Sequence, residues 1–281
     1  LPVHEVSGNA ELAECNIDFR GDIVIHGNVE SGVSIRATGS ITIDGVAEAC
    51  MLEAGKDIIL RGGMLGGNKA SVKTKGAITA KFFEFTNILC EGDLQADVLM
   101  DCSVICHGQI RLTGRKGSII GGKVQAIRGL IATSLGNDAE KRTEIFVGAG
   151  IDVYSRLRVM EKKIEMTREE LAKIEEGLEK FEILSKERGV SYTNDPRRTS
   201  LLRIKIKDSA MLASDEEEVR KLRILAESSR GACVSVIQEI YPGVIINMDE
   251  LKLALKNMAT GVEFYKLPDK IGTRPCSAGV E

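Results

Sequence analysis

The chain of 281 residues is long enough for one large domain or two smaller ones, and its 43% apolar and 28% charged residues indicate a folded protein. A net charge of −3 gives the chain as a whole no attraction to nucleic acid or to an acidic membrane. Its 29 glycines, 5 prolines and absent Trp favour many tight corners around a thin aliphatic core.

The 7 cysteines are an odd number and form no CxxC motif, which predicts reduced thiols and a cytoplasmic protein. We see no signal peptide and no apolar run long enough to cross a membrane. Because the chain begins with Leu1, we expect it to be a fragment of a longer protein.

The first half of the chain contains a repeat of 14–20 residues. Its anchors are Gly21, Gly39, Lys56, Gly76, Gly92, Gly108 and Gly122. Two residues after the anchors stand Ile23, Ile41, Ile58, Ile78, Leu94, Ile110 and Val124. The positions four after, two before and four before each anchor are also apolar or small, and those between them are mostly polar. We expect the anchor glycines at corners with positive φ, with Gly55 taking the corner beside Lys56.

Alternation with a period of two indicates strands with one buried face, and strands repeating at this spacing bury that face by stacking as coils. The fold is therefore predicted to be mainly β: a right-handed parallel β-helix, or β-solenoid, over residues 1–154. An antiparallel sandwich is the alternative, but it would not keep the columns aligned through seven repeats.

Residues 155–230 predict an α-helical coiled-coil hairpin inserted into the solenoid. Apolar residues follow alternate spacings of three and four, with Thr167 as the polar member of the seam. The seam is Leu157, Met160, Ile164, Thr167, Leu171, Ile174, Leu178 and Phe181. Pairs such as Glu169 with Lys173 have the favourable i,i+4 order. The helices, at about 155–187 and 199–229, fold back as an antiparallel pair; intermolecular pairing is the competing arrangement.

Residues 231–270 return to β character, with a turn signal at Tyr241-Pro242-Gly243. We expect these strands to complete or cap the solenoid, which makes the helical pair an insertion between coils. Residues 271–281 are expected to form a mobile tail.

Several stretches resemble the flagellar assembly protein A family of bacterial β-solenoid proteins. They are Asn16–Ile23, Lys81-Phe82-Phe83-Glu84, Gly117–Gly122, Thr143–Gly148 and Tyr241-Pro242-Gly243-Val244. The likeness covers about residues 15–266, in the order solenoid, helices, return strand, and the N-terminal domain usual in that family is mostly absent. The resemblance implies a cytoplasmic bacterial protein with a role in flagellar assembly or placement, and it brings no catalytic residues. The solenoid is also similar to the polymerising bactofilins by fold analogy.

One motif suggests nucleotide binding: Gly117–Lys123 satisfies GxxxxGK. A phosphate-binding loop needs Ser or Thr next and a helix that begins there, but Val124 follows within a strand column. We therefore interpret these glycines as solenoid corners.

Other residues were weighed as ligands or catalytic groups. Cys90 and Cys106 share one column with Cys102 nearby, and we expect buried free thiols there rather than a disulfide or a zinc site. The outward acidic column Asp22, Asp57 and Asp93 is an incomplete calcium pattern. The histidines His4, His26 and His107 suggest no catalytic triad. No catalytic, cofactor-binding or metal residue is predicted.

Two functions are compatible with this sequence. The first is a non-catalytic scaffold or assembly factor that self-associates, as a dimer rather than a filament, and docks protein partners. The second is a ligand- or polysaccharide-binding module, or an enzyme, with a groove between arm and solenoid. Nucleic-acid binding is not expected, because charge is balanced and aromatic residues are few.

Overall fold

The computed structural model describes residues 2–11, 16–114, 116–189 and 191–277. Cys15, one of the seven cysteines, lies outside the described residues. The chain divides into two compact units, one of Leu1–Gly150 with Ser228–Glu281 and the other of Ile151–Glu227.

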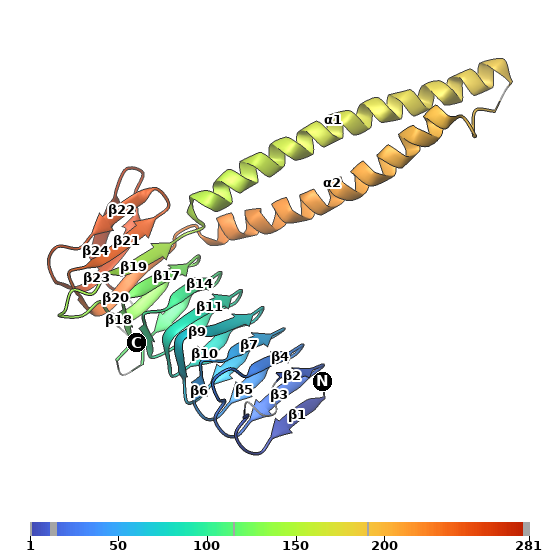
Figure 1. Cartoon of the computed structure of the whole chain (residues 1–281). Helices are drawn as coiled ribbons and strands as arrows, with labels where there is room; N and C mark the ends of the chain where they lie inside the picture. Colours follow the sequence, from blue (N-terminus) through green and yellow to red (C-terminus); the bar gives the residue numbers. More distant parts are fainter. Residues whose placement is uncertain (1, 12–15, 115, 190, 278–281) are drawn as a thin grey trace. The chain divides into compact units, whose positions relative to one another are not determined.

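The larger unit is a mainly β, parallel solenoid of about 7 turns, which confirms the predicted fold class (Figure 1). Each turn contributes strands to as many as three faces. The first face contains β1 (Val3–Val6), β3 (Asp22–Ile25), β5 (Ile41–Ile43), β8 (Ile58–Leu60), β10 (Ile78–Ala80), β12 (Leu94–Gln95), β15 (Ile110–Leu112) and the first halves of β18 (Leu130–Leu135) and β20 (Cys233–Ile240).

The second face contains β2 (Asn16–Phe19), β4 (Ser34–Ala37), β7 (Met51–Ala54), the ends of β9 (Met64–Thr74) and β11 (Phe82–Cys90), β14 (Ser103–Cys106), β17 (Gly122–Ala126), β19 (Thr143–Val147) and β21 (Val244–Met248). The third face contains β6 (Ala47–Glu48), the starts of β9 and β11, β13 (Val98–Met100), β16 (Ser118–Ile120) and the ends of β18 and β20.

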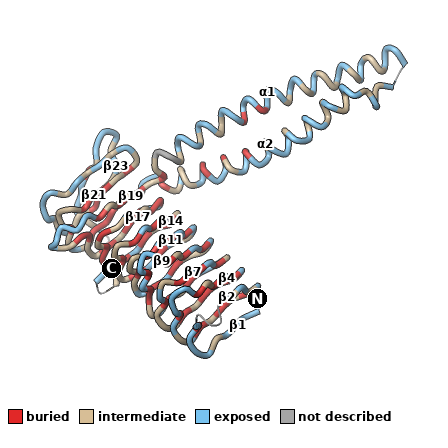
Figure 2. The backbone as a smooth tube through the Cα atoms, in the orientation of Figure 1, coloured by how far each residue is buried: buried red, intermediate tan, exposed pale blue. Residues whose placement is uncertain are grey.

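The predicted register of the first six repeats is confirmed. Ile23 pairs with Ile41, Ile41 with Ile58, and the column continues to Ile110, all fully buried. These side chains share one interior, and Figure 2 shows buried residues in red that recur in each of the stacked strands. The hand of the solenoid stays a prediction.

The seventh anchor, placed at Gly122, is wrong. Ile110 pairs with Leu130 instead of Val124, and Val124 pairs with Val104 on the second face. The amide of Arg128 donates to Gly108 O at 3.1 Å, so Arg128 continues the anchor column. The cause is a longer connection between β15 and β16, which delays the next corner. Ser118 and Ile120, assigned to the second-face columns, belong to β16 on the third face.

The third face supplies a buried column that the repeat search did not find. Its members are Ala10, Val29, Ala47, Met64, Phe83, Leu99, Ile119, Leu135 and Ile240, each at most 2% exposed. The three faces enclose the core between them, as the three columns of buried side chains require.

Gly122, the misplaced seventh anchor, has the expected positive φ, at 77°, but Gly21, Gly39, Gly76, Gly92 and Gly108 do not. They are needed because consecutive turns approach closely: a Cβ on Gly92 would lie 2.6 Å from Gly76 O, and one on Gly108 would lie 2.3 Å from Gly92 O. Gly55 is under the same constraint, 2.2 Å from Thr38 O. Close backbone approach, not backbone conformation, therefore selects glycine at these positions.

The return strands complete the solenoid and then close it. β20 pairs in parallel with β18, and β21 with β19, so the helices are inserted between consecutive turns. Three further strands then pair antiparallel: β22 (Leu251–Ala254) with β21, β23 (Ala259–Lys266) with β20, and β24 (Ile271–Pro275) with β23. The tail expected to be mobile from residue 271 is thus a strand through Pro275, since β23 offers it a free edge; residues 278–281 lie outside the described residues.

The smaller unit contains α1 (Gly150–Arg188) and α2 (Pro196–Ser228). Ion pairs join the two helices in an order that rises along α1 and falls along α2. Arg156 pairs with Glu218 near the open end of the hairpin, and Glu175 pairs with Lys205 nearer its turn. The helices are therefore antiparallel within one chain. The predicted i,i+4 pairs are not among the ion pairs of the described side chains, and the ion pairs that join the two helices use other residues. Neither of the two helices is long and apolar enough over its described residues to cross a membrane.

The polar residues that interrupt the helical seam have partners. Asp215, almost buried, lies 2.7 Å from Lys163 Nζ, and the buried Thr167 hydroxyl donates to Lys163 O at 3.0 Å. A polar residue buried at a helix seam, as Asp215 is here, fixes the alignment of two helices more specifically than apolar contacts alone. The description of the pair as a coiled coil stays a prediction.

Candidate functional site

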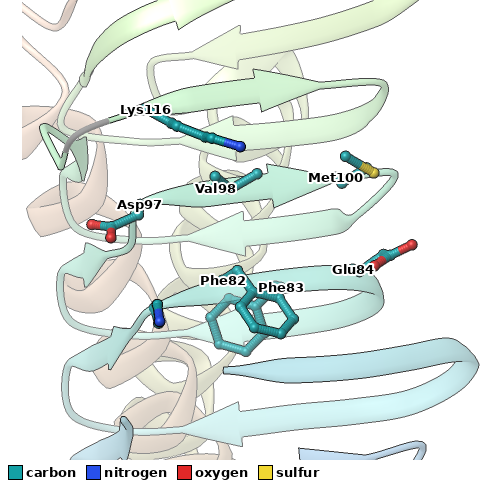
Figure 3. Close-up of a pocket in the computed structure, with 8 residues that line it drawn as sticks. Phe82, Phe83, Glu84, Asp97, Val98, Met100 and Lys116 are labelled. Atoms are coloured by element: carbon teal, nitrogen blue, oxygen red, sulfur yellow. The ribbon is translucent and has the colours of Figure 1, made fainter. Parts of the chain in front are cut away.

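A hollow of about 420 Å³ opens on the outer side of the third face (Figure 3). Strands β11 and β13 form it, together with the turn before β16. Its lining residues are Lys81, Phe82, Phe83, Glu84, Asp97, Val98, Met100 and Lys116. We call this hollow the third-face groove.

The floor of the third-face groove is apolar because three outward positions carry large apolar side chains. Phe82 pairs with Val98 in neighbouring turns, and Met100 stands beside Glu84 in the same register. The Phe82 ring covers Gly63, where a Cβ would lie 2.5 Å from the ring. Glycine at that position therefore lets the ring lie flat against the turn below, while Phe83 points into the core and is fully buried.

Charged side chains surround this floor. Lys81 and Asp97 directly precede β11 and β13 in the sequence. Glu84 stands at the other side of the groove, and Lys116 extends beside Val98 (Figure 3). None of these four belongs to an ion pair that the described side chains form. An apolar floor with unpaired charges at the rim suits the binding of another molecule. The floor can bury apolar surface, and charges at a solvated rim can form ion pairs with a small desolvation cost.

The GxxxxGK segment is β structure, as we interpreted it. Residues 118–120 form β16, and Gly121 and Gly122 form the next corner with φ of 73° and 77°. Lys123 then stands on β17 with its Nζ 4.6 Å from the centre of the Phe146 ring. A strand and not a helix follows these glycines, so the segment lacks the geometry of a phosphate-binding loop.

The stacked cysteines are buried free thiols. Cys90 pairs with Cys106 in register, and their sulfurs donate to Gly76 O and Gly92 O at 3.3 and 3.2 Å. The hydrogen bond with Cys90 and burial raise the pKa of the Cys106 thiol. Burial raises the pKa of Cys102 to about 11 and that of Cys50 to about 12. Cys50, Cys102 and Cys106 are therefore protonated at neutral pH and are poor nucleophiles. The hydrogen bond with Cys106 lowers the pKa of the Cys90 thiol.

The acidic column has a structural role. Asp22, Asp57 and Asp93 each accept the backbone N–H of the equivalent residue in the next turn, at 2.7, 2.8 and 2.8 Å. Asn28 does the same at another corner, accepting Val46 N–H at 2.8 Å. The three aspartates stand in alternate turns of the solenoid, and each caps the corner of the turn that follows.

The histidines do not converge with the cysteines or with each other. His26 Nδ1 lies 2.9 Å from Asp44 Oδ2, the His4 ring lies 5.4 Å from that of Phe19, and His107 is half-buried. Among the residues that the structure describes, no three His, Cys, Asp or Glu side chains form a group that could hold a metal ion.

The sequence did not predict the third-face groove, although Lys81-Phe82-Phe83-Glu84 is one of the stretches that resemble the flagellar assembly protein A family. The feature that could have indicated the groove is the presence of apolar residues at outward strand positions in two consecutive turns. These residues are Phe82 in one turn and Val98 and Met100 in the next. That signal becomes visible only once the third face and its register are known.

Comparison with known protein families gives a match that agrees with this architecture. The family model described as the Flagellar Assembly Protein A beta solenoid domain matches residues 2–271. No curated protein and no solved structure gives a match. The family is one of flagellar assembly proteins and is not a known enzyme family. Because the match spans the solenoid, the inserted helices and the return strands, the chain belongs to the Flagellar Assembly Protein A family.

Proposed function

We propose that this chain is a non-catalytic scaffold of the bacterial cytoplasm that works in flagellar assembly or placement by docking a protein partner and by associating with itself. The observation that carries the proposal is the third-face groove. Its floor is apolar, and the charged side chains at its rim form no ion pair among the described side chains.

The groove supports protein docking in particular. A hollow with apolar floor and polar rim reproduces the usual organisation of a protein interface, in which a buried apolar centre is surrounded by solvated charges. The floor is built on strands rather than on a loop, so that Phe82, Val98 and Met100 are held in place before a partner arrives.

The docking role is tested by restoring motility to a strain that lacks this protein. Val98→Glu places a charge on the groove floor at an outward position, and Thr79→Glu places the same charge at an exposed outward position of the first face. The Thr79→Glu chain should restore motility and the Val98→Glu chain should not, with equal melting temperatures. Full motility with Val98→Glu would refute the docking role of the groove.

The closed end of the solenoid favours a dimer over a filament. The antiparallel strands β22 and β23 cover the edges of β21 and β20, so another parallel turn has no edge to join there. With this end closed, self-association cannot propagate from end to end of the solenoid, and pairing about a two-fold axis gives a closed dimer. Light scattering should give the mass of a dimer; a strict monomer at high concentration would refute self-association.

A small-molecule or polysaccharide ligand is the second candidate, because the volume of about 420 Å³ is that of an ordinary ligand pocket and Phe82 offers an aromatic surface. Calorimetric titration with oligosaccharides separates the two functions. Saturable binding that is lost in Phe82→Ala would favour the ligand, whereas no heat of binding together with the Val98→Glu motility defect favours the scaffold.

A further inference from the structure

The end of the helical hairpin that contains its turn is strongly basic. We call residues 186–189 and 191–207 the hairpin tip. It contains seven Lys and Arg against two Asp and Glu, a net charge of +5 in a chain whose total is −3. The remainder of the chain is therefore acidic, and the positive charge is concentrated at this one end of the smaller unit.

Most of the cations of the tip are unpaired. Lys205 pairs with Glu175, but the other six form no ion pair with any described side chain. These six are Lys186, Arg188, Arg197, Arg198, Arg203 and Lys207. Asp195 does not neutralise them through an ion pair, since its Oδ1 accepts the backbone N–H of Arg197 at 2.7 Å and caps α2.

The opposite end of the hairpin provides the contrast. There Arg156, Lys163, Arg168 and Arg223 each pair with a carboxylate of the other helix. These four stem cations thus have acidic partners on the other helix, whereas Lys205 is the one tip cation paired with a described carboxylate. The other six tip cations are available to a partner.

Exposed isoleucines stand among these cations. Ile206 is 71% exposed, more than any other large apolar side chain described, and Ile204 is 43% exposed. Ile206 follows Arg203 by three residues, so both lie on one helix face, and Lys207 is one turn after Arg203 on α2. An apolar side chain flanked by unpaired cations is the pattern of a surface that enters the headgroup region of a membrane.

This combination distinguishes among anionic partners. A nucleic acid would use the cations but would leave the isoleucines in water, and the one aromatic ring of the tip, Tyr192, is half-buried with its centre 6.2 Å from that of Phe181. A protein would need a pocket shaped for each isoleucine. A bilayer of anionic lipids satisfies both groups at once, with phosphates for the cations and an apolar boundary for Ile206.

We propose that the hairpin tip binds the surface of an anionic lipid bilayer. The cations lie at the level of the lipid phosphates, and Ile206 enters the boundary between headgroups and acyl chains. The interaction is peripheral and reversible, and it is screened by salt. It goes beyond the proposed scaffold function and uses none of the residues of the third-face groove.

The test is co-sedimentation of the full chain with vesicles. Binding should occur to vesicles of equal parts phosphatidylcholine and phosphatidylglycerol, should be absent with phosphatidylcholine alone, and should fall steeply with salt. Each cation contributes about five-fold to binding at an anionic surface, so the triple variant Arg197→Gln/Arg203→Gln/Lys207→Gln should bind about 100-fold more weakly. Ile206→Ser should weaken binding by about ten-fold while leaving the charge unchanged.

The matched control removes three exposed cations from the solenoid, as Lys69→Gln/Lys73→Gln/Lys75→Gln. This variant has the same net charge as the tip variant and should bind vesicles like the unaltered chain. Equal loss in both triple variants would overturn the proposal, because it would reduce the effect to net charge. Failure to bind anionic vesicles at low salt would also overturn it, as would tip-dependent binding to duplex DNA or polyglutamate without binding to vesicles.

Discussion

Phe82 and Phe83 provide a direct test of the solenoid register, because identical neighbouring side chains point to opposite sides of β11. Phe83 is fully buried between Met64 and Leu99 of the adjacent turns, whereas Phe82 is half-buried on the outer side. Phe83→Ala removes a core ring and should lower the free energy of unfolding by about 4 kcal/mol. Phe82→Ala removes about half of a side chain's burial and should cost about 1 kcal/mol.

Urea denaturation followed by circular dichroism at 218 nm measures the difference. With an m-value of about 3 kcal/mol per M, the midpoint should fall by about 1.3 M for Phe83→Ala and by about 0.3 M for Phe82→Ala. Hydrogen exchange of peptides from β9, β11 and β13 should locate the loss of protection to the same turns, and the hairpin should be unaffected. Equal losses, or a larger loss for Phe82→Ala, would refute the register, since a slip by one residue exchanges the two rings.

Three further predictions concern corners, thiols and the hairpin. Asp57→Ala should lower stability by about 1 kcal/mol and Asp57→Asn by much less, as measured by thermal melting, because an amide oxygen can cap the turn as well; equal losses would refute the capping role. The raised pKa values of Cys50 and Cys102 mean that unfolded thiols ionise above about pH 9 while folded ones stay protonated, so stability should fall as pH rises from 9 to about 11, by up to about 1.4 kcal/mol per pH unit for each thiol. Cys50→Ala/Cys102→Ala should remove that part of the slope in melts between pH 7.5 and 10, and an unchanged slope would contradict the assignment. Lys163→Met should destabilise the helices more than Lys163→Met/Asp215→Leu, because the single variant leaves a buried carboxylate unpaired; helical melting at 222 nm would show the reverse order if Asp215 were solvated.

The sequence predicted the first two faces because two periodicities coincide there. Buried and exposed side chains alternate within each strand. In addition, the number of residues from the second-face strand to the first-face strand is nearly constant across six turns. The third face failed that test, since six residues separate Ile58 from Met64 but nine separate Ile110 from Ile119. The same irregularity displaced the seventh anchor.

The third-face groove and the cross-helix ion pairs were beyond sequence reasoning for a different reason. Each depends on which residues become neighbours after the chain returns, as when Phe82 meets Val98 or Lys163 meets Asp215. Local spacing predicts contacts within one helix or strand, so it assigned lysines to glutamates on their own helix. The register between two helices or two turns is decided by their packing as a whole.

The insertion of the helices between turns has a consequence for how the last turn is made during synthesis. About 85 residues separate Val147 from Cys233, and the entropy of closing so long a loop would slow the addition of β20 to β18. The antiparallel hairpin folds from local contacts. The Arg156–Glu218 ion pair near its open end shows that the start of α1 and the end of α2 lie close together. Once the hairpin has formed, the loop that must close between β19 and β20 is effectively a few residues long instead of about 85. This lowers the entropic cost of closure by about 2 kcal/mol, so the inserted helices favour completion of the solenoid.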